Sequence, residues 1–132
     1  MITPLLEKKS TVQFGSGEAL TSAKLNSIVT TENQIIDTIN KILKSYCDIN
    51  QETGIQKKYE LEEAIGLVPP DRRSFTMKIR FIENGDGPDN NLTNIRFAEY
   101  YYTGPVNFTK DDWLNANNWS KNVPNIIDGG EW

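Results

Sequence analysis

The side chains that could carry out acid–base or metal chemistry in this chain are carboxylates, because it has no histidine and one cysteine, Cys47. Acidic residues stand close together at 60, 62 and 63 and at 111 and 112. Acid–base catalysis needs two carboxyl groups held a few ångströms apart, which sequence adjacency does not provide. Solvated helix ends explain both groups. Without histidine, the usual general base, the Ser-His and Cys-His pairs and the commonest metal ligand are missing. We therefore expect a protein that is not an enzyme, with no catalytic residue, metal site or cofactor.

The acidic stretch at 83–91, ENGDGPDNN, invites a calcium interpretation. Counted from Asp86, it fails the EF-hand pattern, because Asn91 replaces the required glycine and no glutamate closes the loop. Its Asn, Asp, Gly and Pro content is typical of a turn. We therefore predict a hairpin turn.

An aromatic group near the C-terminus could bind a sugar or another protein. Its members are Tyr100, Tyr102, Trp113 and Trp119. In a strand, Tyr100 and Tyr102 would share one face and Tyr101 would take the other. Packing in the core or at a subunit interface is the alternative explanation, because large aromatic side chains can anchor an irregular segment.

The residues from Thr21 to about Cys47 predict a long helix. Thr21 suits the N-cap, and no Gly or Pro follows until Gly54, so the helix can run to about Cys47, over about 26 residues or about 39 Å. Apolar residues recur three and four positions apart, with Glu32 as the interruption. The members of this stripe are Leu25, Ile28, Ile35, Ile39, Ile42 and Tyr46.

Two explanations of the stripe remain open: it packs against the protein's own second half, or against the same helix of identical chains. Isoleucine at both core positions of a heptad favours trimers over dimers in parallel coiled coils, and Ile35, Ile39 and Ile42 supply it. We expect self-association, with a homotrimer as the main hypothesis and a dimer as the other.

Further along the chain, residues 74–83 and 92–102 alternate apolar and polar side chains, which predicts an antiparallel hairpin. Thr109 with Asp112 predicts a capped short helix. The organisation we predict is an extended attachment arm (1–19), a long oligomerising helix (20–50), a hinge with a short helix (51–73) and a small β-rich domain with a Trp-containing tail (74–132). The fold class is α+β, a helical bundle followed by a small antiparallel β domain.

The charge argues against two kinds of partner. The chain of 132 residues has a formal net charge of −4 and an isoelectric point near 4.8. No strong positive field would attract nucleic acid or an anionic membrane. The sequence has neither a signal-peptide pattern nor an apolar run of the roughly 20 residues that a membrane helix needs. We therefore expect a soluble protein that binds neither nucleic acid nor membrane.

Two stretches resemble virion fibre and head-appendage proteins of tailed bacteriophages, including crAss-like phages. Residues 14–28, FGSGEALTSAKLNSI, look like the aromatic-Gly turn and helix start that open such proteins, and residues 108–119, FTKDDWLNANNW, are similar to their tryptophan punctuation. The resemblance implies a virion structural protein, made in the host cytoplasm, that attaches or connects a fibre to the particle. Its partners would be copies of itself and capsid, portal-region or fibre proteins. The alternative function is a carbohydrate-binding or host-adsorption module on a helical stalk.

Overall fold

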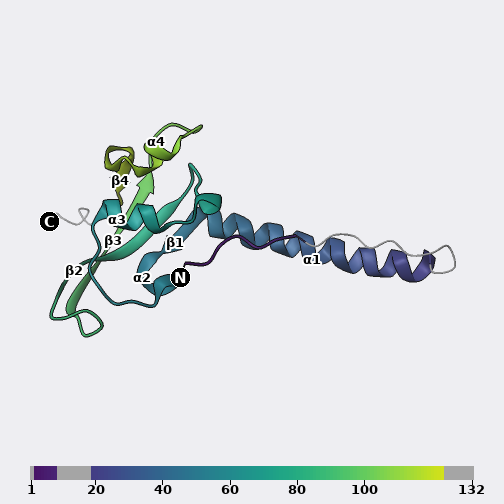
Figure 1. Ribbon diagram of the computed structural model, residues 1–132, viewed down its shortest axis with the longest axis horizontal. Helices are drawn as coiled ribbons and strands as arrows, with labels where there is room; N and C mark the ends of the chain where they lie inside the picture. The colour runs from purple at the N-terminus through teal and green to yellow at the C-terminus, as the bar shows by residue number, and fades with distance from the viewer. Residues whose placement is uncertain (1, 9–18, 124–132) are drawn as a thin grey trace, which may run out of the picture.

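The protein is an α+β molecule in which a long N-terminal helix leads into a four-stranded mixed sheet (Figure 1). The computed structural model describes residues 2–8 and 19–123, with side chains in the long helix described from Ser27 onward. The predicted α+β class is confirmed. The predicted oligomeric bundle is a statement about several chains, and it stays a prediction.

Helix α1 (Ala19–Ser45) has 27 residues and projects away from the sheet (Figure 1). It begins two residues before the predicted N-cap, Thr21, and ends two residues before the predicted end at Cys47. The early end has a clear cause. Tyr46 begins strand β1 (Tyr46–Asp48), so the backbone groups at the end of the predicted helix pair with a sheet instead.

The sheet has the strand order β1-β2-β3-β4. Strands β2 (Lys78–Asp86) and β3 (Thr93–Tyr102) form the predicted antiparallel hairpin, and β4 (Trp119–Lys121) pairs antiparallel with β3. Strand β1 pairs parallel with β2. Within 74–132 the described strands pair antiparallel as predicted, but the sheet as a whole is mixed, because the chain enters it directly from α1 as β1 and reaches β2 through a long crossover connection.

Short helices fill that connection and follow the hairpin. Helices α2 (Ile49–Thr53) and α3 (Leu61–Leu67) precede the 3-10 turn η2 (Pro70–Arg72), and α4 (Lys110–Leu114) precedes the 3-10 turn η3 (Ala116–Asn118). The predicted cap of α4 is confirmed: Thr109 Oγ1 accepts from the Asp112 N–H, and an Asp112 oxygen accepts from the Thr109 N–H.

The core lies on one face of the sheet, under α3 and α4. Ile79 and Phe81 of β2 pack there with Ile65 of α3 and Trp113 of α4. The segment predicted as a hinge, 51–73, contributes several buried side chains to this core, which are Tyr59, Ala64, Ile65, Val68 and Arg72. This segment is therefore built into the folded head, the part of the protein formed by residues 46–123.

Candidate self-association surface

Among the described residues, the apolar stripe of α1 is largely exposed in the single chain. The exposed fractions are 55% for Ile28 and Ile35, 37% for Ile39, 61% for Ile42 and 38% for Tyr46. The side chain of Leu25, the sixth predicted interface residue, lies outside the described side chains. Isolated apolar side chains are common on protein surfaces, but a contiguous row along one helix face is typical of an interaction site.

The stripe is narrow and straight. At about 100° per residue, Ile28, Ile35, Ile39 and Ile42 fall within about 60° of one another around the axis of α1. Neighbouring members are three, four or seven residues apart, so each side chain lies over the next along the helix. This is the pattern of a helix that packs lengthwise against another helix.

The N-terminal segment occupies a different flank of α1. Residues 2–8 run back along the helix, as Figure 1 shows in purple. The Leu6 N–H donates to Asn40 Oδ1 at 2.8 Å, and Asn40 Nδ2 donates to the Leu6 carbonyl at 3.0 Å. Lys8 forms an ion pair with Asp37 at 2.9 Å. Asn40 lies about 100° around the helix from Ile39, so the arm docks beside the stripe without covering it.

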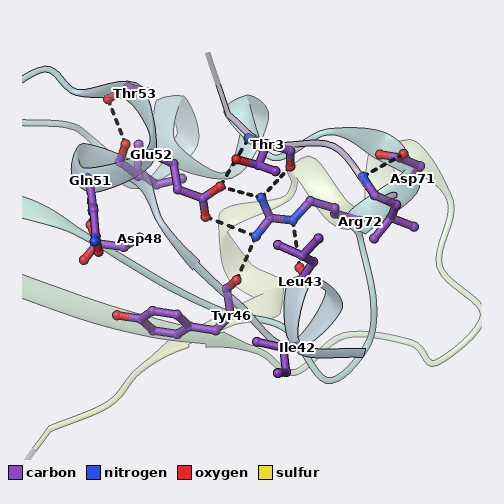
Figure 2. Close-up of polar contacts among 12 residues, drawn as sticks. Thr3, Ile42, Leu43, Tyr46, Asp48, Gln51, Glu52, Thr53, Asp71 and Arg72 are labelled. Carbon is purple, nitrogen blue, oxygen red and sulfur yellow. Dashed lines mark hydrogen bonds and ion pairs between the residues drawn. The ribbon is translucent and has the colours of Figure 1, made fainter. Parts of the chain in front are cut away.

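A fully buried arginine joins the arm, the helix and the head (Figure 2). Arg72 Nε donates to the Leu43 carbonyl at 2.7 Å and Nη2 to the Tyr46 carbonyl at 2.8 Å, at the C-terminal end of α1. Nη1 donates to the Thr3 carbonyl at 2.7 Å, and Glu52 accepts from both Nη atoms at 2.7 and 3.1 Å. These bonds use all five N–H donors of the guanidinium.

The same group satisfies carbonyls that a helix leaves unpaired at its end. It also affects Glu52. Partial burial would raise the pKa of Glu52, but the hydrogen bonds and the charge of Arg72 outweigh burial, so that the pKa lies below its ordinary value. Because Ile2 is buried as well, the arm starts from a firm anchor. Helix α1 is therefore attached to the head by more than its covalent link.

Tyr46 stands at the joint between the helix and the sheet. It lies four residues after Ile42 and seven after Ile39, so it continues the stripe, and it is also the first residue of β1. Burial raises the pKa of its hydroxyl, with Asp48 adding to the effect. In Figure 2 its ring and the side chain of Ile42 both lie on the side away from the Arg72 guanidinium.

The predicted aromatic contacts are placed mostly in the core. Trp113 is fully buried, and its indole N–H donates to the Ile65 carbonyl at 2.9 Å. Trp119 and Tyr102 are nearly buried, and both rings pack on Trp113. Tyr100 is half-buried and stacks on Phe81. The four side chains therefore form no open platform for a sugar, because three of them are enclosed by the core.

Two of the acidic side chains considered for chemistry have local structural partners. Asp112 caps α4, and Glu63 pairs with Lys57 at 3.1 Å. Within residues 2–8 and 19–123, no group of three or more His, Cys, Asp or Glu side chains could hold a metal ion. In that same part of the chain, no helix is long and apolar enough to cross a membrane.

Sequence reasoning missed two polar residues that shape this surface. Asn26, Asn33 and Asn40 repeat every seven residues, which is typical of a solvated flank, yet Asn40 binds the arm. Arg72 follows two prolines in a polar segment and gives no sign of its burial. The signal for Asn40 was its heptad repeat beside the stripe; Arg72 had none.

No family model, no curated protein and no solved structure matches this chain, so its function is inferred from the helix and its uncovered stripe.

Proposed function

We propose that this chain is a non-enzymatic virion structural protein of a tailed bacteriophage, a head-fibre or appendage component that attaches or connects a fibre to the particle. It works as a homotrimer held together by α1. The single observation that carries the proposal is the uncovered row of isoleucines along a helix that projects from a small head. The resemblance of residues 14–28 and 108–119 to phage appendage proteins supplies the setting.

The energetics favour association along the whole stripe. Full burial of an isoleucine side chain contributes about 1.5 to 3 kcal/mol, and association costs about 4 to 15 kcal/mol in lost freedom. One or two isoleucines would not offset that cost, whereas the row of four, repeated on every chain, is of the right size. Isoleucine at both heptad core positions favours three strands.

The junction at the base of α1 suits a connector. A connector transmits force between its ends, so its stalk must not swivel on its head. Arg72 binds carbonyls of α1, the arm and Glu52 of α2 at one point, and this arrangement restrains such motion. The described part of the predicted attachment arm, residues 2–8, binds the chain's own helix and head.

Two measurements test the proposal. Light scattering coupled to size exclusion should give three times the mass of one chain, 15.0 kDa. An antibody against the protein should label intact phage particles in electron micrographs. A monomer at micromolar concentration would overturn the trimer, and particles that carry no label would overturn the virion assignment.

The alternative is a carbohydrate-binding or host-adsorption module on the same stalk. Burial of Trp113, Trp119 and Tyr102 weighs against it, because sugar-binding aromatic rings present an open face. A titration with glycans monitored by tryptophan fluorescence separates the two functions. A connector gives no saturable response, and a saturable one would favour the alternative.

A further inference from the structure

The sheet has a second face, which the core does not use. Side chains paired across β1, β2 and β3 form two rows on it: Tyr46, Lys78 and Tyr101 in one, and Asp48, Arg80 and Glu99 in the next. Phe97 follows on β3, with the Arg80 guanidinium 3.6 Å from its ring centre. We call this surface the open face.

The open face carries large uncovered aromatic side chains. Tyr46, Phe97 and Tyr101 are exposed by 38%, 45% and 40%. Helices α3 and α4 pack on the opposite face, over Ile79 and Phe81. Beside Phe97 the open face is hollowed into a groove of about 420 Å³, which Ile55 and Ile82 help to line. Of the three exposed rings, Phe97 lines this groove, while Tyr46 and Tyr101 are exposed elsewhere on the same face.

Tyr46 fixes the direction of this surface relative to the stripe. It continues the heptad row just beyond the end of α1, and it is the first member of the row that it forms with Lys78 and Tyr101 on the open face. One side chain points in one direction, so at the base of α1 the stripe and the open face look toward the same side. A neighbour that covers Ile42 and Tyr46 therefore stands in front of Tyr101 as well.

The charges of the open face also fit a second copy. In a symmetric assembly, equivalent faces surround one axis, so a face of one sign would repel its neighbours. Here Lys78 and Arg80 balance Asp48 and Glu99, and the Arg80–Asp48 ion pair measures 2.9 Å. The formal charges of these four side chains therefore sum to zero within each chain, so equivalent faces brought together around one axis carry no net repulsion.

We propose that the open faces of the three copies meet around the trimer axis, so that the self-association surface continues from α1 through Tyr46 onto Phe97 and Tyr101. This inference rests on the proposed association of α1. It adds that the heads are held together around the same axis and do not splay apart above a helical stalk.

A chemical-accessibility experiment tests the inference on the full chain. Cys47 is fully buried, and burial raises the pKa of its thiol to about 12, so it stays silent toward maleimide reagents. A Tyr101→Cys variant then carries one reactive thiol on the open face. We expect it to react at least tenfold more slowly in the assembled protein than in the same variant carrying Ile35→Asp, which separates the chains.

A matched control is Val106→Cys, in the loop that leads from β3 to α4, where Val106 is 61% exposed. Its thiol should react equally fast in both backgrounds. Equal rates for Tyr101→Cys in both backgrounds, with light scattering still showing a trimer, would overturn the open-face contact and leave the proposed function standing. A monomer in the wild-type background would overturn both.

A second variant tests the same contact without introducing a cysteine. Replacing both Phe97 and Tyr101 by serine should raise the concentration at which the protein dissociates by at least tenfold. The control pair, Phe75→Ser with Val106→Ser, removes similarly exposed apolar side chains outside the open face. It should leave the dissociation concentration unchanged. Equal shifts from the two pairs would contradict the inference.

Discussion

At the scale of single residues, Arg72 is the side chain whose loss we expect to destabilise the fold most. Its guanidinium is fully buried, and each donor has a partner, so no smaller cation can replace it. Arg72→Met would leave Glu52 partly buried without its counter-charge and would free three carbonyls. Removing one partner of a buried ion pair costs about 3 to 5 kcal/mol, and we expect the free energy of unfolding to fall by that amount.

Chemical denaturation measures this change, at one protein concentration because folding and assembly are linked. The exposed Arg96 supplies the control, since Arg96→Met should change stability by less than about 0.5 kcal/mol. A loss of under about 1 kcal/mol in Arg72→Met would show that the junction contributes little.

The same pair gives a pH dependence. In the folded chain the pKa of Glu52 lies below its ordinary value of 4.5, so its carboxylate stabilises the fold above that pH. This contribution should be lost as the pH falls below about 4.5 and through the folded pKa. Thermal unfolding between pH 3 and 6 should therefore show a steeper acid loss in the wild type than in Glu52→Gln. Parallel profiles would mean that ionisation of Glu52 contributes nothing to the pH dependence of stability.

At the scale of elements, some parts followed from local chemistry. The hairpin β2–β3 was predictable because its apolar positions alternate and its turn is rich in Asn, Asp, Gly and Pro. The cap of α4 was predictable because Thr109 and Asp112 have the spacing of a capping box. Both are local, and residues close in sequence decide them.

Strand β1 was not predictable in the same way. Its three residues continue the helical pattern of α1, and Tyr46 fits both periods. What makes 46–48 a strand is its pairing with β2, about 30 residues later, and the Arg72 bond to the Tyr46 carbonyl. Long-range pairing overrides local preference here, as is common for short apolar segments.

The arm gives an element-scale prediction. Asn40 holds the Leu6 backbone with two hydrogen bonds on an exposed helix flank. Asn40→Ala removes both, so we expect the Leu6 amide to exchange its hydrogen at least fivefold faster, with little change in the helix because alanine favours it. Thr38→Ala, on the same exposed helix, is the control. Unchanged exchange at Leu6 would mean that Arg72 and buried Ile2 hold the arm without Asn40.

At the scale of the whole molecule, the apolar stripe of α1 was predictable from the sequence, but its exposure in the single chain was not. Periodicity identifies an apolar face and cannot say which surface covers it. The alternative, packing on the chain's own second half, would bury Ile28, Ile35 and Ile42, yet all three are more than half exposed among the described residues. The aromatic residues were ambiguous for the same reason, and three of the four proved to be core.

The final prediction concerns assembly, and it uses two neighbouring positions on α1. Ile35 lies on the stripe, and Gln34 lies about 100° away on an exposed flank. Ile35→Asp would place a carboxylate of each chain in a dry shared core, where burying an unpaired charge costs several kcal/mol. Gln34→Asp adds the same residue type and charge to the same helix but leaves it in water. We expect light scattering to give a monomer for Ile35→Asp and the wild-type mass for Gln34→Asp, with circular dichroism showing a folded head in both. If both variants keep the wild-type mass, the stripe does not hold the chains together. If both variants give a monomer, a general loss of helix stability explains the dissociation, and the shared core is contradicted as well.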